Sequence, residues 1–142
     1  MRIAIDFDGT VVAHCFPKVG PDVGAQRVLK KLVMNGHKLI LYTMRSDKQT
    51  SGKITDETVT GVSGNYLTDA IKWFEKNDIP LYAVGKDPNQ ESWTESNKCY
   101  AEMYIDDCAL GTPLIIDLNK SDKPFVDWDK LEELLIQEGY IA

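Results

Sequence analysis

The stretch IAIDFDGTVV, residues 3–12, decides how the rest of the chain is interpreted. Its first three residues form an apolar run typical of a strand buried on both faces of a parallel sheet. Asp6 and Asp8 follow, although a buried carboxylate is costly unless it is paired, hydrogen-bonded or bound to a metal. Residues two apart on a strand-like path point the same way, so both carboxylates can converge on one ligand, which Gly9 lets the backbone approach closely. The alternative is a strand that frays into a polar turn, because Asp and Gly are common turn residues.

Length and composition predict one globular domain, residues 1–142. The chain has 43% hydrophobic and 27% charged residues, as soluble domains do. Its net charge of −6 disfavours a nucleic-acid-binding or membrane-surface protein. An anionic substrate remains compatible with this charge, because a bound cation reverses the local field.

Three features predict a cytoplasmic protein. No apolar run reaches membrane-spanning length, and the first residues lack a signal-peptide pattern. The three cysteines are odd in number and lack close paired spacing, which indicates reduced thiols rather than a disulfide framework or a zinc site.

Strand-like and helix-like segments alternate along the chain. Apolar, β-rich runs predict strands over residues 2–7, 37–43, 81–84 and 102–105, with 113–117 as a candidate fifth. Helical spacing predicts helices over residues 23–35 and 66–77, a weaker one over 92–100, and a closing helix that begins near Trp128. We expect Asp22 to cap the first helix and Gly36 to end it. The alternation predicts an α/β fold, a Rossmann-like three-layer α/β/α sandwich with a central parallel sheet.

Polar side chains follow three of the predicted strands. Asp6 and Asp8 come after the first, Thr43 ends the second, and Asp106 and Asp107 follow the fourth. Ligands of open α/β sheets bind at the carboxyl ends of the strands, so these side chains are expected at one edge. This convergence favours a ligand site over a frayed turn for the first two aspartates.

The sequence at this point resembles the haloacid dehalogenase (HAD) superfamily, most of whose members are magnesium-dependent phosphatases. The family's motifs are matched in order by DFDGT (residues 6–10), by the threonine of LILYTMR (39–45), by Lys98, and by YIDD (104–107). The resemblance covers most of the chain. It implies a phosphohydrolase that acts on a phosphomonoester through an aspartyl-phosphate, with Mg²⁺ as cofactor.

The resemblance also implies roles for the acidic residues. Asp6 is expected to be the nucleophile, and Asp8 the general acid and base. Asp6, the main-chain carbonyl of Asp8, and Asp106 would ligate Mg²⁺, and Asp107 would ligate through water or orient a ligand. The metal would offset the repulsion between carboxylate and phosphate.

The remaining motif residues are expected to contact the phosphoryl group. The resemblance implies that Thr43 donates a hydrogen bond to it and that Lys98 neutralises charge, with Lys86 as a rival lysine because it also follows a strand. Met44 and Arg45 lie beside Thr43 and are candidate substrate-binding residues. Arg45 can equally form a surface salt bridge.

Gly9 and Thr10 complete the candidate substrate-binding set, within a turn that leads into the next segment. Relatives carry a flap there, and residues 11–24 have the length and the Pro/Gly content for it. The spacing between motifs leaves no room for a large cap domain. The site would therefore accept small or bulkier phosphorylated substrates, and a homo-oligomer is one way to cover it. Residues 47–64 are either a surface loop or a cover for the substrate.

A non-enzymatic phosphoacceptor or a metal- or phosphate-binding regulatory domain is the main alternative. Response-regulator receivers also use an acidic pair, a phosphorylated Asp, a Thr and a Lys on a parallel sheet. In receivers the acidic pair comes early, whereas here the expected nucleophile comes first and Asp106 and Asp107 come last. A phosphotransferase of the same superfamily remains a further alternative.

Overall fold

The sheet at the centre of the protein has four parallel strands in the order β3-β2-β1-β4. The structure is a computed structural model that describes residues 1–47 and 64–142. The sixteen positions 48–63, and with them almost all of the predicted loop 47–64, lie outside the described residues. The elements are β1 (Arg2–Ile5), α1 (Ala25–Met34), β2 (Lys38–Leu41), α2 (Tyr66–Lys76), β3 (Ala83–Val84), the 3-10 turn η1 (Gln90–Ser92), β4 (Met103–Ile105), β5 (Leu114–Ile115), β6 (Phe125–Val126) and α3 (Trp128–Gln137).

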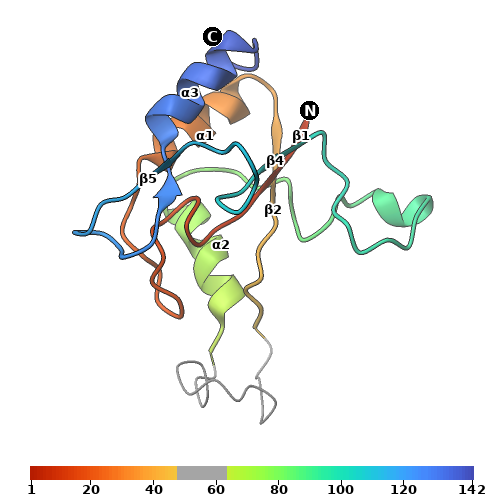
Figure 1. The fold of residues 1–142 in the computed structure, drawn as a ribbon. Helices are drawn as coiled ribbons and strands as arrows, with labels where there is room; N and C mark the ends of the chain where they lie inside the picture. Colours follow the sequence, from red (N-terminus) through yellow and green to blue (C-terminus); the bar gives the residue numbers. More distant parts are fainter. Residues whose placement is uncertain (48–63) are drawn as a thin grey trace.

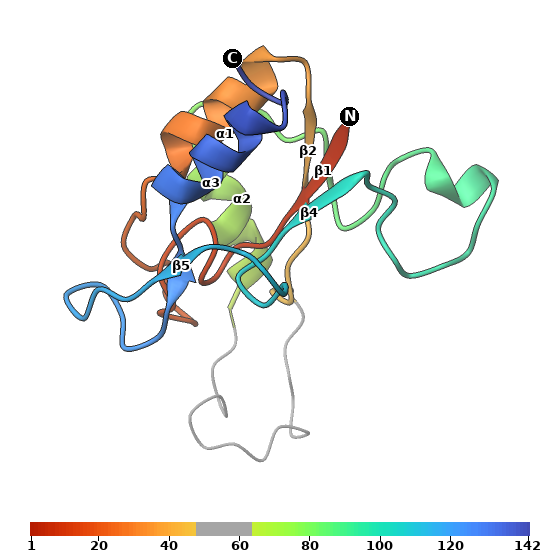
Figure 2. The ribbon, with the colours of Figure 1, turned by 45° about the horizontal axis from the view of Figure 1, so that its top comes forward.

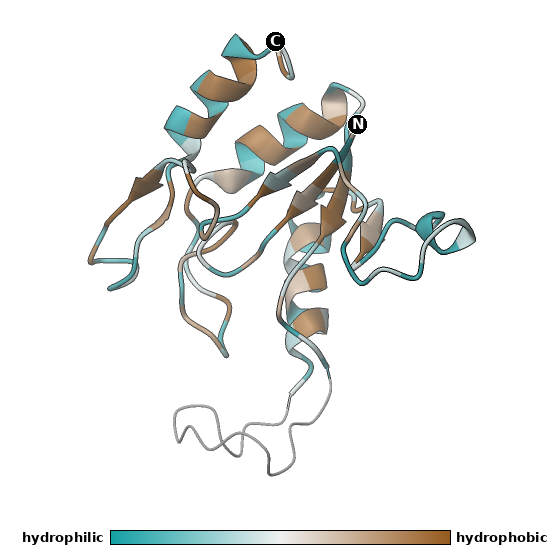
Figure 3. Ribbon diagram, turned by 45° about the vertical axis from the view of Figure 1, so that its right-hand side comes forward, coloured by the Kyte–Doolittle hydropathy of each residue, from teal (hydrophilic) through white to brown (hydrophobic). Residues whose placement is uncertain are grey.

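Both faces of the sheet are covered, as the apolar strand sequences predict. Ile3 and Ile5 of β1 pack with buried residues of all three helices, whereas Ala4 points to the other face and contacts Ile40 and Cys99. Figure 3 shows the strands as hydrophobic segments, while the helices carry hydrophobic and hydrophilic residues on different sides. Figures 1 and 2 show the helices on one side of the sheet and the 3-10 turn on the other. The three-layer α/β expectation is confirmed.

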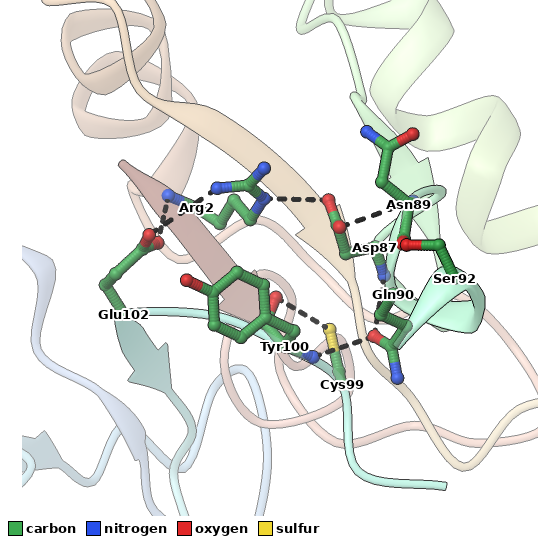
Figure 4. Close-up of polar contacts among 8 residues, drawn as sticks. All are labelled: Arg2, Asp87, Asn89, Gln90, Ser92, Cys99, Tyr100 and Glu102. Carbon is green, nitrogen blue, oxygen red and sulfur yellow. Dashed lines mark hydrogen bonds and ion pairs between the residues drawn. The ribbon is translucent and has the colours of Figure 1, made fainter. Parts of the chain in front are cut away.

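The third layer, on the face of the sheet opposite the three α-helices, contains the 3-10 turn η1 and is held by buried hydrogen bonds. The amide oxygen of Gln90 accepts from the main-chain N–H of Asp87 (3.1 Å) and of Tyr100 (2.9 Å), and its nitrogen donates to the carbonyl of Lys98 (3.0 Å). Arg2 on β1 donates to the Asp87 carboxylate at 2.7 Å, which ties this loop to the sheet (Figure 4). One buried glutamine thus satisfies several main-chain groups of a loop that lacks regular structure.

The prediction of a helix over residues 92–100 is wrong. The 3-10 turn ends at Ser92, and two side chains then bond to the local backbone: Thr94 accepts from the N–H of Ser96, and Ser96 accepts from the N–H of Lys98 (both 3.1 Å). Such local bonds compete with the helical ladder.

The predicted N-cap of the first helix is also wrong. The N-cap is Gly24, whose φ of 91° lies in the left-handed region, and Asp22 instead accepts a hydrogen bond from Trp73 Nε1 at 3.1 Å. The predicted stop is confirmed, because α1 ends one residue before Asn35 and Gly36 has a φ of 85°.

The candidate fifth strand does not join the parallel sheet. Residues 114–115 pair antiparallel with β6, a strand that the sequence did not reveal. Phe125 and Val126 of β6 are both buried and lead directly into α3, which packs beside α1. Within the described ranges, no helix is both long and apolar enough to span a bilayer.

Candidate functional site

Three neighbouring strands end together at one edge of the sheet. Ile5 of β1 is in register with Leu41 of β2 and with Ile105 of β4. The main-chain N–H of Asp6 donates to the carbonyl of Ile105 at 3.0 Å. Asp6 and Asp106 therefore leave adjacent strands side by side, as the sequence analysis expects.

A tight turn follows Asp6 and brings the first motif back toward β4. The carbonyl of Phe7 accepts from the N–H groups of Thr10 (3.1 Å) and Val11 (2.8 Å). Gly9 has a φ of 81°, and a Cβ atom there would collide with the side chains of His14 and Asp107. Position 9 therefore requires glycine for both its backbone conformation and its contacts.

The buried hydroxyl of Thr10 joins the first and fourth motifs. It donates to Oδ2 of Asp6 at 2.8 Å and accepts from the main-chain N–H of Asp107 at 3.0 Å. Its carbonyl accepts a hydrogen bond from Trp128 Nε1 at 2.7 Å, so α3 supports the same turn. Thr10 therefore positions the Asp6 carboxylate, and its predicted contact with substrate stays a prediction.

The acidic residues of this edge lie in an unfavourable environment for negative charge. Burial raises the pKa of Asp6 to about 8; the Thr10 hydrogen bond acts against this shift, and the charges of Asp106 and Asp107 add to it. Burial also raises the pKa of Asp106, reinforced by Asp107 and opposed by the N–H of Cys108, which donates to it at 2.8 Å. Among the described residues, no Lys or Arg forms an ion pair with Asp6 or Asp106.

This donor set fits a hard divalent cation. Ligand atoms of Asp106, Asp107 and Cys108 lie within 4.8 Å of one another, and Asp6 is adjacent through the Thr10 bridge. Crowded carboxylates that lack lysine or arginine partners are stabilised by a cation that prefers oxygen ligands, and Mg²⁺ keeps several waters in place of further protein ligands. Asp6, Asp106, Asp107 and the main chain of Asp8 are therefore the residues that would hold it.

Asp8 points to a different partner from the other aspartates. Both of its oxygens accept hydrogen bonds from Arg45, from Nε and from a terminal nitrogen, each at 2.7 Å. The Arg45 side chain is almost fully buried, and its guanidinium lies over the rings of Phe7 (5.0 Å) and Phe16 (5.2 Å). Arg45 therefore forms a buried ion pair, and its expected role in binding substrate is not favoured by this geometry.

Thr43 and Met44 lie at the same edge, beyond the end of β2. The Thr43 hydroxyl accepts from the main-chain N–H of Arg45 at 3.1 Å, which leaves its own proton for another acceptor. The Met44 side chain is 97% exposed and has no packing that would define a binding pocket.

The two candidate lysines belong to the same loop, in which Gln90 bonds to the carbonyl of Lys98 and to the N–H of Asp87, the residue after Lys86. The Nζ of Lys98 lies 5.7 Å from the centre of the Tyr104 ring and forms no ion pair with Asp6, Asp106 or Asp107. Lys86 follows β3, just after Gly85, whose N–H donates to the carbonyl of Leu41.

His14 is a site residue that sequence reasoning missed. Its Nε2 lies 2.9 Å from Oδ2 of Asp107, and it packs against Gly9. The flap segment turns back on itself, because the N–H of Ala13 donates to the carbonyl of Pro21 at 2.9 Å and Val12 pairs with Asp22. The spacing of the motifs does not predict the contact between His14 and Asp107, because that contact depends on how the flap segment, residues 11–24, folds back.

Comparison with known proteins identifies the family but names no activity. A conserved protein from Bacteroides thetaiotaomicron, known from its solved structure, is 32% identical to this chain, with a TM-score of 0.67. The similarity covers 97% of this chain and 90% of that one. No protein-family model and no curated protein matches the sequence. The chain belongs to the same family as the conserved Bacteroides protein.

Proposed function

We propose that this chain, as a member of that family, is a Mg²⁺-dependent phosphohydrolase of the HAD type that cleaves a phosphomonoester through an aspartyl-phosphate. The observation that carries the proposal is the acidic edge: Asp6, Asp106 and Asp107 come together at the carboxyl ends of β1 and β4, and among the described residues no lysine or arginine pairs with them. Such an edge can bind a divalent cation, and the bound cation would then attract a phosphate dianion.

Asp6 is the nucleophile in this proposal. The Thr10 hydroxyl holds one of its oxygens at 2.8 Å and thereby orients the other for attack on phosphorus. When bound, Mg²⁺ lowers the repulsion between the carboxylate and the phosphoryl oxygens. The raised pKa of Asp6 indicates that the cation is also needed to keep this carboxylate ionised near neutral pH.

The hydroxyl of Thr43 and one lysine complete the phosphate-binding groups of the proposal. The Thr43 oxygen already accepts from the N–H of Arg45, so its proton points away from that bond and can be donated to a phosphoryl oxygen. Lys98 is the motif-matching lysine, and its Nζ lies 5.7 Å from the centre of the ring of Tyr104, two residues before Asp106.

One observation favours a second function, that of a phosphoacceptor or phosphotransferase domain. Both oxygens of Asp8 accept a hydrogen bond from Arg45, which leaves fewer of their lone pairs for a water molecule. A phosphorylated Asp6 that hydrolyses slowly is the property of a phosphoacceptor. The lifetime of the phosphoenzyme separates the two functions.

The test uses 4-nitrophenyl phosphate, a generic aryl phosphate. Hydrolysis should disappear with a chelator and return with Mg²⁺, whereas Ca²⁺ should support it poorly because its looser coordination misplaces the nucleophile. Asp6→Asn should abolish turnover, since an amide does not form the acyl-phosphate. Asp122→Asn is the matched control, because Asp122 is exposed and lies in the turn region between β5 and β6.

Trapping and mapping the phosphoenzyme by mass spectrometry decides the nucleophile. A label on Asp6 with turnover of at least several per minute supports the hydrolase, and a stable label on Asp6 with negligible turnover supports the phosphoacceptor. Undiminished hydrolysis in chelator, or a label on Asp8 or Asp106 instead, contradicts the proposal.

A further inference from the structure

Arg45 is buried beside the site, and the motifs give it no task. We infer that Arg45 is a positioning residue that holds the Asp8 carboxyl group and the flap segment, residues 11–24, in one arrangement for proton transfer to the leaving group. The inference rests on the proposed function and extends it to a residue outside the four motifs.

The contact with Asp8 has the geometry that restrains a carboxylate most strongly. Two N–H groups of Arg45 donate to the two oxygens of Asp8, each at 2.7 Å. A planar guanidinium in this two-pronged arrangement fixes both the position and the plane of the carboxylate, which a lysine ammonium does not do. The Arg45 side chain is 1% exposed, so water does not compete for these donors.

The same guanidinium holds the flap segment. It donates to the carbonyl of Lys18 at 2.8 Å, and the ring of Phe16 lies 5.2 Å from its central carbon. A further contact, 3.3 Å to the carbonyl of Tyr66, reaches the start of α2. Arg45 therefore joins the flap segment, α2 and Asp8 through one charged group, and a displaced flap would also release Asp8.

The chemical consequence concerns the leaving group. In the first step an oxygen of Asp6 forms a bond to phosphorus while the bond from phosphorus to the leaving oxygen breaks. The electron pair goes to that oxygen, which takes a proton from the Asp8 carboxyl group, and Asp8 ends the step as a carboxylate. The observed pair with Arg45 matches this carboxylate. An alkoxide leaving group needs the proton, whereas 4-nitrophenolate leaves well without it.

The experiment compares kcat/KM for two phosphomonoesters, 4-nitrophenyl phosphate and 2-phenylethyl phosphate, with Mg²⁺ present. Arg45→Met should lower the value for the alkyl ester at least tenfold more than the value for the aryl ester, through kcat rather than KM. Asp8→Asn should show the same selectivity. The double variant Asp8→Asn/Arg45→Met should lose little more than Asp8→Asn alone, because both changes remove one function.

Two further variants keep the test decisive. Arg45→Lys retains the charge but lacks the two-pronged donor, so it should lower the alkyl-to-aryl ratio of kcat/KM in the same direction but by less. It replaces Arg45→Met in the test if that variant does not fold. Asp87→Asn breaks the buried Arg2–Asp87 pair (2.7 Å) on the other face of the sheet. It should lower stability and leave the alkyl-to-aryl ratio unchanged.

Each outcome has one meaning. Equal losses on both esters in Arg45→Met and Arg45→Lys, or losses that add fully to those of Asp8→Asn, overturn the positioning role while the phosphatase assignment stands. Hydrolysis that Asp6→Asn leaves intact overturns the proposed function, and the inference with it.

Discussion

The carboxyl group of Asp6 should make the metal-free protein less stable as the pH rises, and Asp6→Asn should remove this dependence. In the unfolded chain Asp6 loses its proton near its ordinary pKa of 3.8, whereas in the folded protein burial keeps the proton on up to about pH 8. Between these values the folded state binds the extra proton. Its stability therefore falls as the pH rises through this window.

The magnitude follows from the width of that window. Each pH unit costs the folded state about 1.4 kcal/mol. Between pH 5 and pH 8 the loss from Asp6 alone is up to about 4 kcal/mol, a large part of a typical domain stability of about 5–15 kcal/mol. Asn has no proton to lose and can still accept the hydrogen bond from Thr10.

The assay is urea unfolding, followed by circular dichroism, at both pH values in the presence of a chelator. The stability difference between Asp6→Asn and the natural sequence should grow by up to about 4 kcal/mol from pH 5 to pH 8. Saturating Mg²⁺ should restore stability to the natural sequence and not to the variant, because a ligand that binds only the folded state stabilises it. Parallel pH dependence in the two proteins refutes the reasoning.

Two other changes test the neighbourhood of the site. Lys98→Ala should lower kcat/KM on an aryl phosphate at least tenfold while Lys86→Ala has a smaller effect, and the reverse ranking assigns the motif-three role to Lys86. Trp128→Phe removes the donor to the buried carbonyl of Thr10 at 2.7 Å and should cost about 2 kcal/mol of unfolding free energy in urea titrations. An unchanged urea midpoint for that variant would show that the bond does not support the turn.

The sequence predicts the strands of the sheet and the helices that cover its first face. The apolar run before Asp6 and the helical spacing within 66–77 are both confirmed, the second as α2 (Tyr66–Lys76). These predictions are confirmed because an element that buries one face has apolar residues at regular intervals in the sequence. β6 could not be predicted in this way, because its two buried residues are too few to show a regular interval.

The third layer and the contacts of Arg45 could not be predicted for a different reason. Gln90 replaces a helix by bonding to the backbone of distant loop residues, and the N–H of Tyr100 is ten positions away. Arg45 meets Asp8, 37 positions earlier, only because the flap segment and α2 enclose it. Long-range polar contacts of this kind depend on the finished fold, and the sequence offers only the residue types.

The central place of β1 has a consequence for the folding of the protein. Thr10, in the turn after this strand, contacts Asp107, which is 97 positions away in the sequence, and Trp128, which is 118 positions away. β1 and β2 are close in the sequence and can pair early, whereas the acidic edge also needs β4 and α3, which are distant from β1 in the sequence. Contacts so distant along the chain slow folding. The acidic edge should therefore form late in folding, once α3 has docked against the turn that contains Thr10.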